Sequence, residues 1–243
     1  MQYWAVTDPG CVRTQNQDTY LTEMLDKNTL LCVVCDGMGG AKSGNVASNL
    51  AADVFMQEIK RTWVTGMDPE KADEMLRNAV KLANFTVYDQ AQQFEEFTGM
   101  GTTLVAALVT GNFATIVNVG DSRAYSITQD DVKQLTVDHS LVQMMIARGE
   151  LTPERARTYP GKNLITRAIG TETLAECDIF HRRLVSGECL LLCTDGLSNQ
   201  VDEQEIIFEV VHGQNKQSSG ERLLEIAKKR GAPDNVTCVL IQV

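Results

Sequence analysis

Short apolar runs bounded by polar turn residues recur along the chain and predict eight β-strands. We expect these strands at residues 3–7, 19–23, 29–36, 102–109, 114–120, 123–128, 188–194 and 236–243. Turn-forming residues at 26–28, 111–112 and 129–131 interrupt the apolar pattern for only two or three positions. Because connections this short join antiparallel neighbours, the pattern predicts β-hairpins.

Apolar residues spaced three and four apart predict helices between these strands. The clearest case is 45–61, where Val46, Leu50 and Val54 fall on one face. A second helix is expected at 69–97, with Asp68 as its N-cap and Pro69 in its first turn. Further helices are expected at 202–211 and 218–229, whereas 140–162 shows weak periodicity and reads as short polar helices and loops.

The order of these elements predicts an α+β protein with sheets inside and helices outside. No repeat, low-complexity tract or Pro/Ser-rich linker interrupts the 243 residues, so we expect a single domain over 1–243.

The overall charge narrows the range of partners. The formal net charge is −10 and the isoelectric point is about 4.8. Nucleic acids and anionic membrane surfaces would be repelled, so neither is expected as a partner. The apolar runs are too short for a membrane span, and the first ten residues do not resemble a signal peptide. We therefore expect a cytoplasmic protein.

The cysteines fit this compartment. There are seven, an odd number without the spacing of a disulfide framework. Cys32 and Cys35 form a C-x-x-C pattern that is also typical of redox or zinc sites. Their odd offset within a predicted strand directs them to opposite faces, so we interpret them as small buried apolar residues.

The strongest chemical signal is a set of aspartates at predicted strand ends, often beside glycine. Asp36-Gly37, Asp121 and Asp195-Gly196 follow apolar strands, whereas Asp18 and Asp234 precede strands. A carboxylate at a buried strand end is costly unless it is paired or bound to a cation. A single such aspartate is most simply a turn former, but several at equivalent places predict one carboxylate-lined rim. Oxygen ligands of this kind favour Mg²⁺ or Mn²⁺.

Arg13 lies five residues before Asp18, on a loop that leads into a predicted strand. A guanidinium there can bind phosphate oxygens in bidentate fashion. Two cations beside one arginine form an arrangement suited to phosphate-ester hydrolysis, because the cations lower the pKa of a shared water. That water would attack phosphorus in line while the arginine and the cations neutralise the equatorial oxygens.

The sequence resembles the metal-dependent protein phosphatase (PPM) family, also called the protein phosphatase 2C group, in its short bacterial form. The resemblance runs in family order over nearly the whole chain. It is carried by RTQNQD at 13–18, DGMGG at 36–40, GTT at 101–103, VGDSRAY at 119–125, DHS at 138–140, TRAIG at 166–170, TDGLS at 194–198 and DNVT at 234–237.

The resemblance implies an α-β-β-α sandwich of two antiparallel sheets flanked by helix pairs. It also implies a metal-dependent phosphoprotein phosphatase, a phosphoric monoester hydrolase that acts on phosphoserine and phosphothreonine without a covalent phosphoenzyme. Its partners would be phosphorylated proteins, targets of Ser/Thr kinases in signalling, and the enzyme is expected to be a monomer. Residues 140–162 match the family's variable flap.

The resemblance also assigns residue roles. Asp36 would bridge two core Mn²⁺ or Mg²⁺ ions and Gly37 would bind one of them through its carbonyl oxygen. Asp195 and Asp234 would be ligands of the first ion. Three further matches complete the site: Asp18 as a water-mediated or outer ligand, Arg13 as the phosphate clamp, and Asp121, helped by Asp195, as the ligand of a weaker third ion.

Two departures from the family pattern concern charge and proton transfer. Gln17 stands where the family often has Glu, which removes one negative charge. Met38 and Ala41 occupy the positions where animal and many bacterial members, respectively, have a histidine. The three histidines, His139, His181 and His212, lie outside this loop, and His139 is expected to be structural. Our hypothesis is that water on the Asp121 cation protonates the leaving oxygen.

Three other interpretations of the sequence differ in the function that they give to these motifs. A nucleotide P-loop at 36–43 fails because Asp36 and Ala41 stand at its two glycine positions, and the G-x-G-x-x-G dinucleotide motif fails at Lys42. A non-catalytic pseudophosphatase would not need the retained metal and phosphate positions. A phosphatase for one dedicated anti-sigma-factor antagonist remains open, because selectivity would lie in the flap and the surface.

Overall fold

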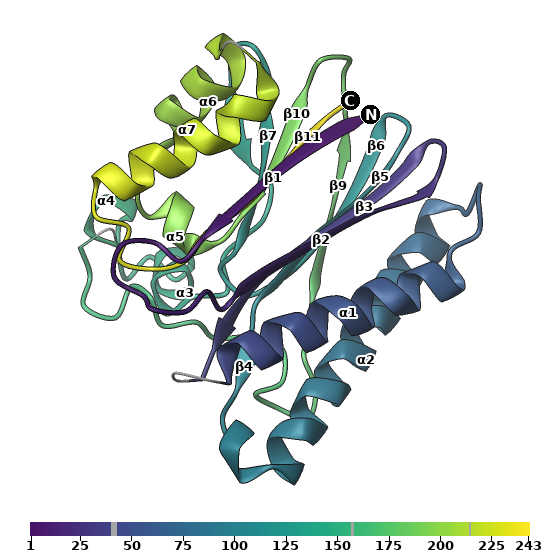
Figure 1. Ribbon diagram of the computed structural model, residues 1–243, viewed down its shortest axis with the longest axis vertical. Coiled ribbons are helices and arrows are strands. Elements are labelled where there is room, and N and C mark those ends of the chain that lie inside the picture. The colour runs from purple at the N-terminus through teal and green to yellow at the C-terminus, as the bar shows by residue number, and fades with distance from the viewer. Residues whose placement is uncertain (40–42, 157, 214) are drawn as a thin grey trace.

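The computed structural model describes residues 1–39, 43–156, 158–213 and 215–243. It contains two antiparallel sheets packed face to face (Figure 1). Along the first sheet the strands run in the order β1 (Gln2–Asp8), β11 (Val236–Gln242), β10 (Cys189–Cys193), β7 (Arg123–Ile127) and β8 (Val132–Gln134). Along the second they run in the order β2 (Asp18–Asp26), β3 (Thr29–Met38), β5 (Leu104–Thr110), β6 (Phe113–Val119) and β9 (Asp178–Arg183), and the short β4 (Gly101–Thr102) pairs with the end of β3.

Helices cover the outer face of each sheet (Figure 1). The second sheet carries α1 (Gly44–Thr62) and α2 (Pro69–Gln93), and a 3₁₀ turn, η1 (Glu95–Phe97), follows them. The first sheet carries α6 (Glu203–His212) and α7 (Lys216–Lys229). Short helices α3 (Leu141–Ala147), α4 (Pro153–Ala156) and α5 (Asp195–Ser198) lie in the connections. The predicted α-β-β-α sandwich is therefore confirmed.

Strand β3 shows how the sequence produces this layering. Leu30, Cys32 and Val34 pack between the two sheets, whereas the alternate residues Leu31, Val33 and Cys35 pack beneath α1 and α2. Both faces of the strand are buried, so it reads as a continuous apolar run. Cys32 and Cys35 point to opposite faces and are buried as free thiols, as the spacing predicted.

The predicted elements match the observed ones with a few corrections. Strands β8 and β9 were not predicted because they are short edge strands without clear apolar alternation. The predicted strand 102–109 is interrupted at Thr103, between β4 and β5. The second helix begins with Asp68 as its cap, as predicted, but α2 ends at Gln93 rather than at 97.

The region 140–162 contains α3 and α4 and connecting loops, in line with its weak periodicity. Gly40, Ala41 and Lys42, on which part of the loop argument rested, lie outside the described residues. No helix in the described part of the chain combines the length and the apolarity that a bilayer crossing requires.

Candidate active site

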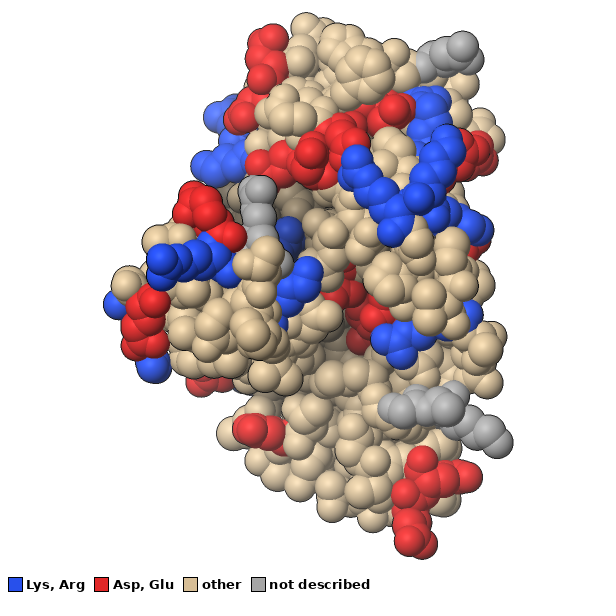
Figure 2. Space-filling model, turned by 90° about the vertical axis from the view of Figure 1, so that its left-hand side faces the viewer, with Lys and Arg blue, Asp and Glu red and all other residues tan. Residues whose placement is uncertain are grey.

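The antiparallel topology brings five aspartates to one end of the sandwich. Residues at the ends of β3, β6 and β10 and at the starts of β2 and β11 meet there. A cleft of about 550 Å³ opens at this end. Its lining includes Arg13, Gln17, Asp36, Gly37, Met38, Thr103, Asp121, Asn163, Ile165, Asp195 and Asp234. Figure 2 shows acidic side chains in a hollow near the centre of this face, with basic side chains on its rim.

Asp36 lies near the end of β3, and its backbone is fixed by two threonines. Its N–H donates to Thr103 Oγ1 at 2.9 Å, and its carbonyl oxygen accepts from the Thr103 N–H at 2.9 Å and from Thr102 Oγ1 at 2.8 Å. Thr103 Oγ1 also lies 2.7 Å from Ser122 Oγ. Thr103 therefore ties the Asp36 backbone to the turn that carries Asp121.

Asp18 faces Asp36 across the β2–β3 pair and is buried behind the cleft. Thr194 Oγ1 donates to Asp18 Oδ2 at 2.9 Å and links the two sheets. Asp18 Oδ1 is buried and has no hydrogen-bond partner among the described residues. A buried carboxylate oxygen without a partner is unusual and calls for a missing ligand such as water or an ion.

Asp195 and Asp121 follow β10 and β6. Asp195 is the first residue of the short helix α5, and its Oδ2 accepts from Asn199 Nδ2 at 3.0 Å. Asp121 lies between β6 and β7, and its side chain lines the same cleft. The two carboxylates are close enough to interact, because the charge of Asp195 adds to burial in raising the pKa of Asp121.

Asp234 and Arg13 lie at the more open edge of the cleft. Arg13 Nη2 donates to Asp234 Oδ2 at 2.9 Å. Asn235, which follows Asp234 in the chain and is buried, holds the loop that carries Arg13. Its Oδ1 accepts from the Gln17 N–H at 2.8 Å, and its Nδ2 donates to the carbonyl oxygens of Pro9 and Gln15.

Four of these carboxyls have pKa values above their usual range. Burial is the main cause for each of them, and neighbouring carboxylates add to it. Burial together with Asp195 and Asp234 raises the pKa of Asp18 to about 7. Burial, then Asp195 and Asp138, raises the pKa of Asp121 to about 7.

The same causes act on the remaining two carboxyls. Burial followed by the charge of Asp18 holds the pKa of Asp36 well above its ordinary value, and burial followed by the charge of Asp234 raises that of Asp195. Crowded carboxyls with raised pKa values are typical of functional sites.

Gly37 shows why no side chain fits at the floor of the cleft. A Cβ there would lie 2.1 Å from the carbonyl oxygen of Gly44 and 2.7 Å from that of Gln17. The Gly37 N–H donates to the Gln17 carbonyl oxygen at 3.1 Å. The start of α1 and the loop before β2 therefore approach the Asp36-Gly37 backbone more closely than any other residue would permit.

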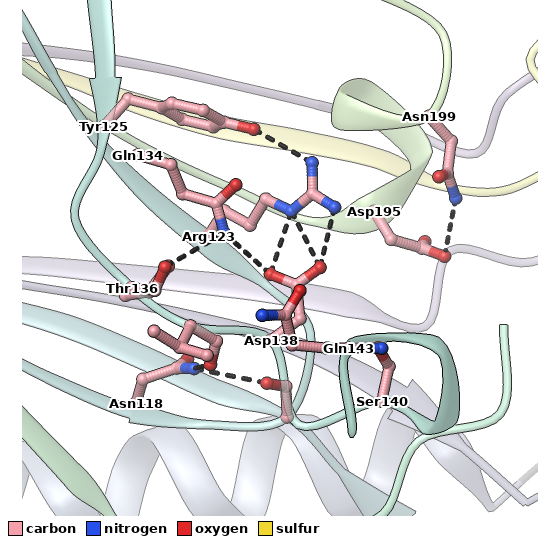
Figure 3. A network of polar contacts seen from close by, with 12 residues as sticks. Asn118, Arg123, Tyr125, Gln134, Thr136, Asp138, Ser140, Gln143, Asp195 and Asn199 are labelled. Atoms are coloured by element: carbon pink, nitrogen blue, oxygen red, sulfur yellow. Dashed lines mark hydrogen bonds and ion pairs between the residues drawn. The ribbon is translucent and has the colours of Figure 1, made fainter. Parts of the chain in front are cut away.

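A half-buried cation, Arg123, lies beside the cluster in a separate network (Figure 3). Arg123 makes a bidentate contact with Asp138, from Nη2 to Oδ2 at 2.6 Å and from Nε to Oδ1 at 3.0 Å, and its Nη1 donates to the Tyr125 hydroxyl oxygen at 3.1 Å. Its charge lowers the pKa of Asp195 and of Asp121, against the larger effect of burial. Asp138 largely compensates this charge, so the cleft keeps its excess of carboxylates.

The donor chemistry of the cleft fits hard divalent cations. The converging groups are carboxylate oxygens and the backbone at Gly37, and Asp18 offers a buried oxygen that no other described residue contacts by a hydrogen bond. Within the described residues, no three or more Asp, Glu, His or Cys side chains form a group that could hold an ion as they lie. The fit therefore rests on the type, burial and convergence of the donors.

Every residue to which the sequence assigned a site role lies at this end of the molecule. Arg13, Asp36, Gly37, Asp121, Asp195 and Asp234 line the cleft, and Asp18 lies behind it. Their roles as ligands and clamp remain predictions. Thr103, Thr194 and Asn235 lie within the family motifs, but the sequence alone gives them no role, because their contacts join segments that are far apart in the chain.

The comparisons with known proteins agree on one family. The family described as "Protein phosphatase 2C" matches residues 12–240. "Serine/threonine phosphatase stp" of Listeria innocua is 35% identical over 237 residues, which cover 97% of this chain and 93% of that protein. "Protein phosphatase PhpP" of Streptococcus pneumoniae is 35% identical, over 100% of this chain and 98% of that protein.

Solved structures show the same fold. The crystal structure of serine/threonine phosphatase Stp1 from Staphylococcus aureus superposes with a TM-score of 0.93 at 37% identity and covers 100% of this chain and 94% of that one.

Proposed function

Because the chain belongs to the protein phosphatase 2C family and is therefore a phosphoprotein phosphatase, we propose that it hydrolyses phosphoserine and phosphothreonine in proteins by direct attack of water at phosphorus. The observation that carries this proposal is the convergence of Asp36, Asp121, Asp195, Asp234 and Arg13 on one cleft. The relatives named as serine/threonine phosphatases support the substrate class.

The proposal includes Mn²⁺ or Mg²⁺ as cofactor. Asp36, Gly37, Asp195 and Asp234 would hold two core ions, Asp18 would support them from behind, and Asp121 with Asp195 would hold a weaker third ion. When bound, such ions supply positive charge and lower the pKa of water. The raised pKa values support this role, because a site that disfavours ionised carboxylates by themselves is stabilised by cations.

Arg13 would bind the phosphoryl oxygens. Among the described residues that line the cleft, only Arg13 has a guanidinium group. Its side chain reaches the Asp234 carboxylate from the rim. A guanidinium can offer two parallel N–H donors to a phosphate, which orients the phosphorus as well as neutralising charge. Its exposure leaves it accessible to a phosphate group on a protein surface.

The described residues that line the cleft do not include a histidine. We propose that solvent held beside Asp121 supplies the proton to the leaving serine or threonine oxygen. The pH–rate profile of Asp121→Ala tests this point. Loss or displacement of one limb relative to wild type is expected, and unchanged acidic and basic limbs would show that the proton comes from elsewhere.

The proposal also covers the setting of the enzyme. Residues 1–243 would form one phosphatase domain in which 140–162 act as a flap, and the protein would act as a cytoplasmic monomer on targets of Ser/Thr kinases in signalling. The seven free cysteines support a reducing compartment.

Hydrolysis of a phosphothreonine peptide with Mn²⁺, with and without chelator, tests the function. We expect turnover that disappears with chelator and in Asp36→Asn, whereas Asp53→Asn, at an exposed aspartate of α1, keeps it. Acid quenching during turnover of a ³²P-labelled substrate should leave the protein unlabelled. Metal-independent turnover, labelled protein, or no turnover at all would contradict the proposal, and the last result would leave only a binding role.

A further inference from the structure

The turn that carries Asp121 has a backbone that must be held from outside. Gly120 adopts a φ of +108°, in the region that favours glycine, and a Cβ there would lie 2.6 Å from Thr103 Cγ2. Asp121 follows directly, and its side chain lines the cleft. The direction of that side chain is therefore set by the peptide groups on either side of Gly120.

His139 holds Gly120 at both of its polar backbone atoms. The Gly120 N–H donates to His139 Nδ1 at 3.1 Å, and the His139 N–H donates to the Gly120 carbonyl oxygen at 2.9 Å. His139 is 7% exposed and does not line the cleft. The next residue, Ser140, is the N-cap of α3, so this contact lies where the region 140–162 begins.

The other side of the imidazole ring is fixed as well. Because Nδ1 accepts a hydrogen bond, the ring proton of the neutral form is on Nε2. Nε2 lies 3.2 Å from Asp178 Oδ2 and donates to it. Arg167 Nη1 lies 3.3 Å from the same Nε2 and donates to Asp178 Oδ1 at 3.1 Å. A carboxylate thus sets the tautomer and the orientation of a histidine that in turn accepts from a backbone amide.

We propose that His139 is a positioning residue that holds the Gly120–Asp121 peptide and thereby directs the Asp121 carboxylate into the cleft. It acts through Asp121 and not on the substrate. This inference rests on the proposed function of the cleft, because the value of directing Asp121 lies in its role there. The Thr166 N–H donates to the His139 carbonyl oxygen at 2.7 Å, so the same residue also joins the segments before and after residues 140–162.

Three substitutions at His139 distinguish a role of the Nδ1 hydrogen-bond acceptor from a role of the side chain in packing. Asparagine places a carbonyl oxygen near the position of Nδ1, whereas glutamine places its polar end near Nε2, and leucine has no polar end. We expect His139→Leu to lower kcat with Mn²⁺ on a phosphothreonine peptide by about 10- to 100-fold. His139→Asn should recover most of that loss and His139→Gln should not. Equal recovery by both amides, or wild-type kcat in His139→Leu, would overturn the proposal.

A double-mutant cycle tests whether the effect passes through Asp121. If it does, Asp121→Ala with His139→Leu turns over no more slowly than Asp121→Ala alone. Losses that multiply in the double variant would overturn the proposal. His181→Leu is the matched control, since it removes a surface histidine that contacts Asp73 at 2.9 Å, and it should leave kcat unchanged.

Hydrogen exchange of the Gly120 amide gives a readout that needs neither metal nor turnover. In chelator, exchange at Gly120 should be faster in His139→Leu and His139→Gln than in wild type, and protected in His139→Asn. Unchanged protection in all three would overturn the inference. If the wild type lacks Mn²⁺-dependent turnover, the proposed function fails, whereas this exchange experiment still decides whether His139 holds the turn.

Discussion

At the scale of single residues, Arg13 occupies a position with two competing partners. Its Nη2 lies 2.9 Å from Asp234 Oδ2. In the proposed mechanism, however, Asp234 would bind a cation and Arg13 would bind phosphate. A cation at Asp234 and the Arg13 guanidinium compete for the same carboxylate, because both need its negative charge. Cation binding would therefore release Arg13 toward the substrate.

This competition predicts that removal of the Arg13 side chain affects phosphopeptide turnover and Mn²⁺ binding in opposite directions. Arg13→Ala should lower kcat/KM for a phosphopeptide by roughly 10²-fold, the effect typical of losing one donor to a transition-state oxyanion. The same variant should bind Mn²⁺ more tightly in a calorimetric titration. Arg13→Lys keeps the positive charge but lacks the planar guanidinium. Its kcat/KM and its Mn²⁺ affinity should therefore lie between those of the wild type and those of Arg13→Ala. A variant with weaker Mn²⁺ binding and unchanged kcat/KM would contradict both roles.

The sequence could predict the acidic and basic residues of the cleft but not the residues that hold them. Aspartate beside glycine at the end of an apolar strand is a local pattern, visible within a few positions. The role of Asn235 depends on Gln17, which is 218 residues away, and that of Thr194 depends on Asp18, which is 176 residues away. Such contacts form only when the two sheets come together, so no local sequence pattern predicts them.

At the scale of elements, the reliable predictions were those with a strong apolar pattern. Helices α1 and α7 were located within a few residues because their apolar positions repeat, and strand β3 was located because its apolar run is continuous. Strand β9 was missed because its edge position relaxes that requirement: only Ile179 and Phe180 are large and apolar there. The interruption at Thr103 was missed for another reason, since this residue serves the site rather than the sheet.

The interruption between β4 and β5 leads to a prediction about Thr103. Thr103→Val keeps the shape but removes the acceptor for the Asp36 N–H and the contact with Ser122. A buried N–H without a partner is costly, and the Asp36 loop should lose its fixed position. We expect Mn²⁺ affinity to fall roughly tenfold, as for other residues that support metal ligands, measured by calorimetry.

The control for this experiment is Thr115→Val, at a buried threonine in the middle of β6. It should leave Mn²⁺ affinity at the wild-type value, even if the melting temperature changes. Equal losses of affinity in both variants would show a general packing effect rather than support of Asp36.

At the scale of the whole molecule, the buried carboxyls link stability to pH. The pKa of Asp18 is about 7 in the folded protein against an ordinary value of 3.8. Between these values the folded state holds more protons than the unfolded state, so the free energy of unfolding contributed by this group falls as pH rises from about 4 to 7. Asp121 acts in the same direction.

The variant Asp18→Asn isolates this contribution. In chelator, its stability relative to wild type should increase with pH by up to about 1.4 kcal/mol per pH unit across that window and stay level above it. Denaturant unfolding at a series of pH values measures the difference. A difference that is constant or decreases from pH 4 to 7 would show that Asp18 is not held in this way.

Four aspartates from distant segments line one cleft at one end of the two sheets, and a fifth, Asp18, lies behind it. The most direct test of the account is calorimetric titration of Mn²⁺ into the cation-free protein, for wild type and for Asp36→Asn. We expect two ions to bind the wild type tightly and tight binding to be lost in the variant. A wild type that binds no Mn²⁺, or an Asp36→Asn protein that binds it as the wild type does, would contradict the account.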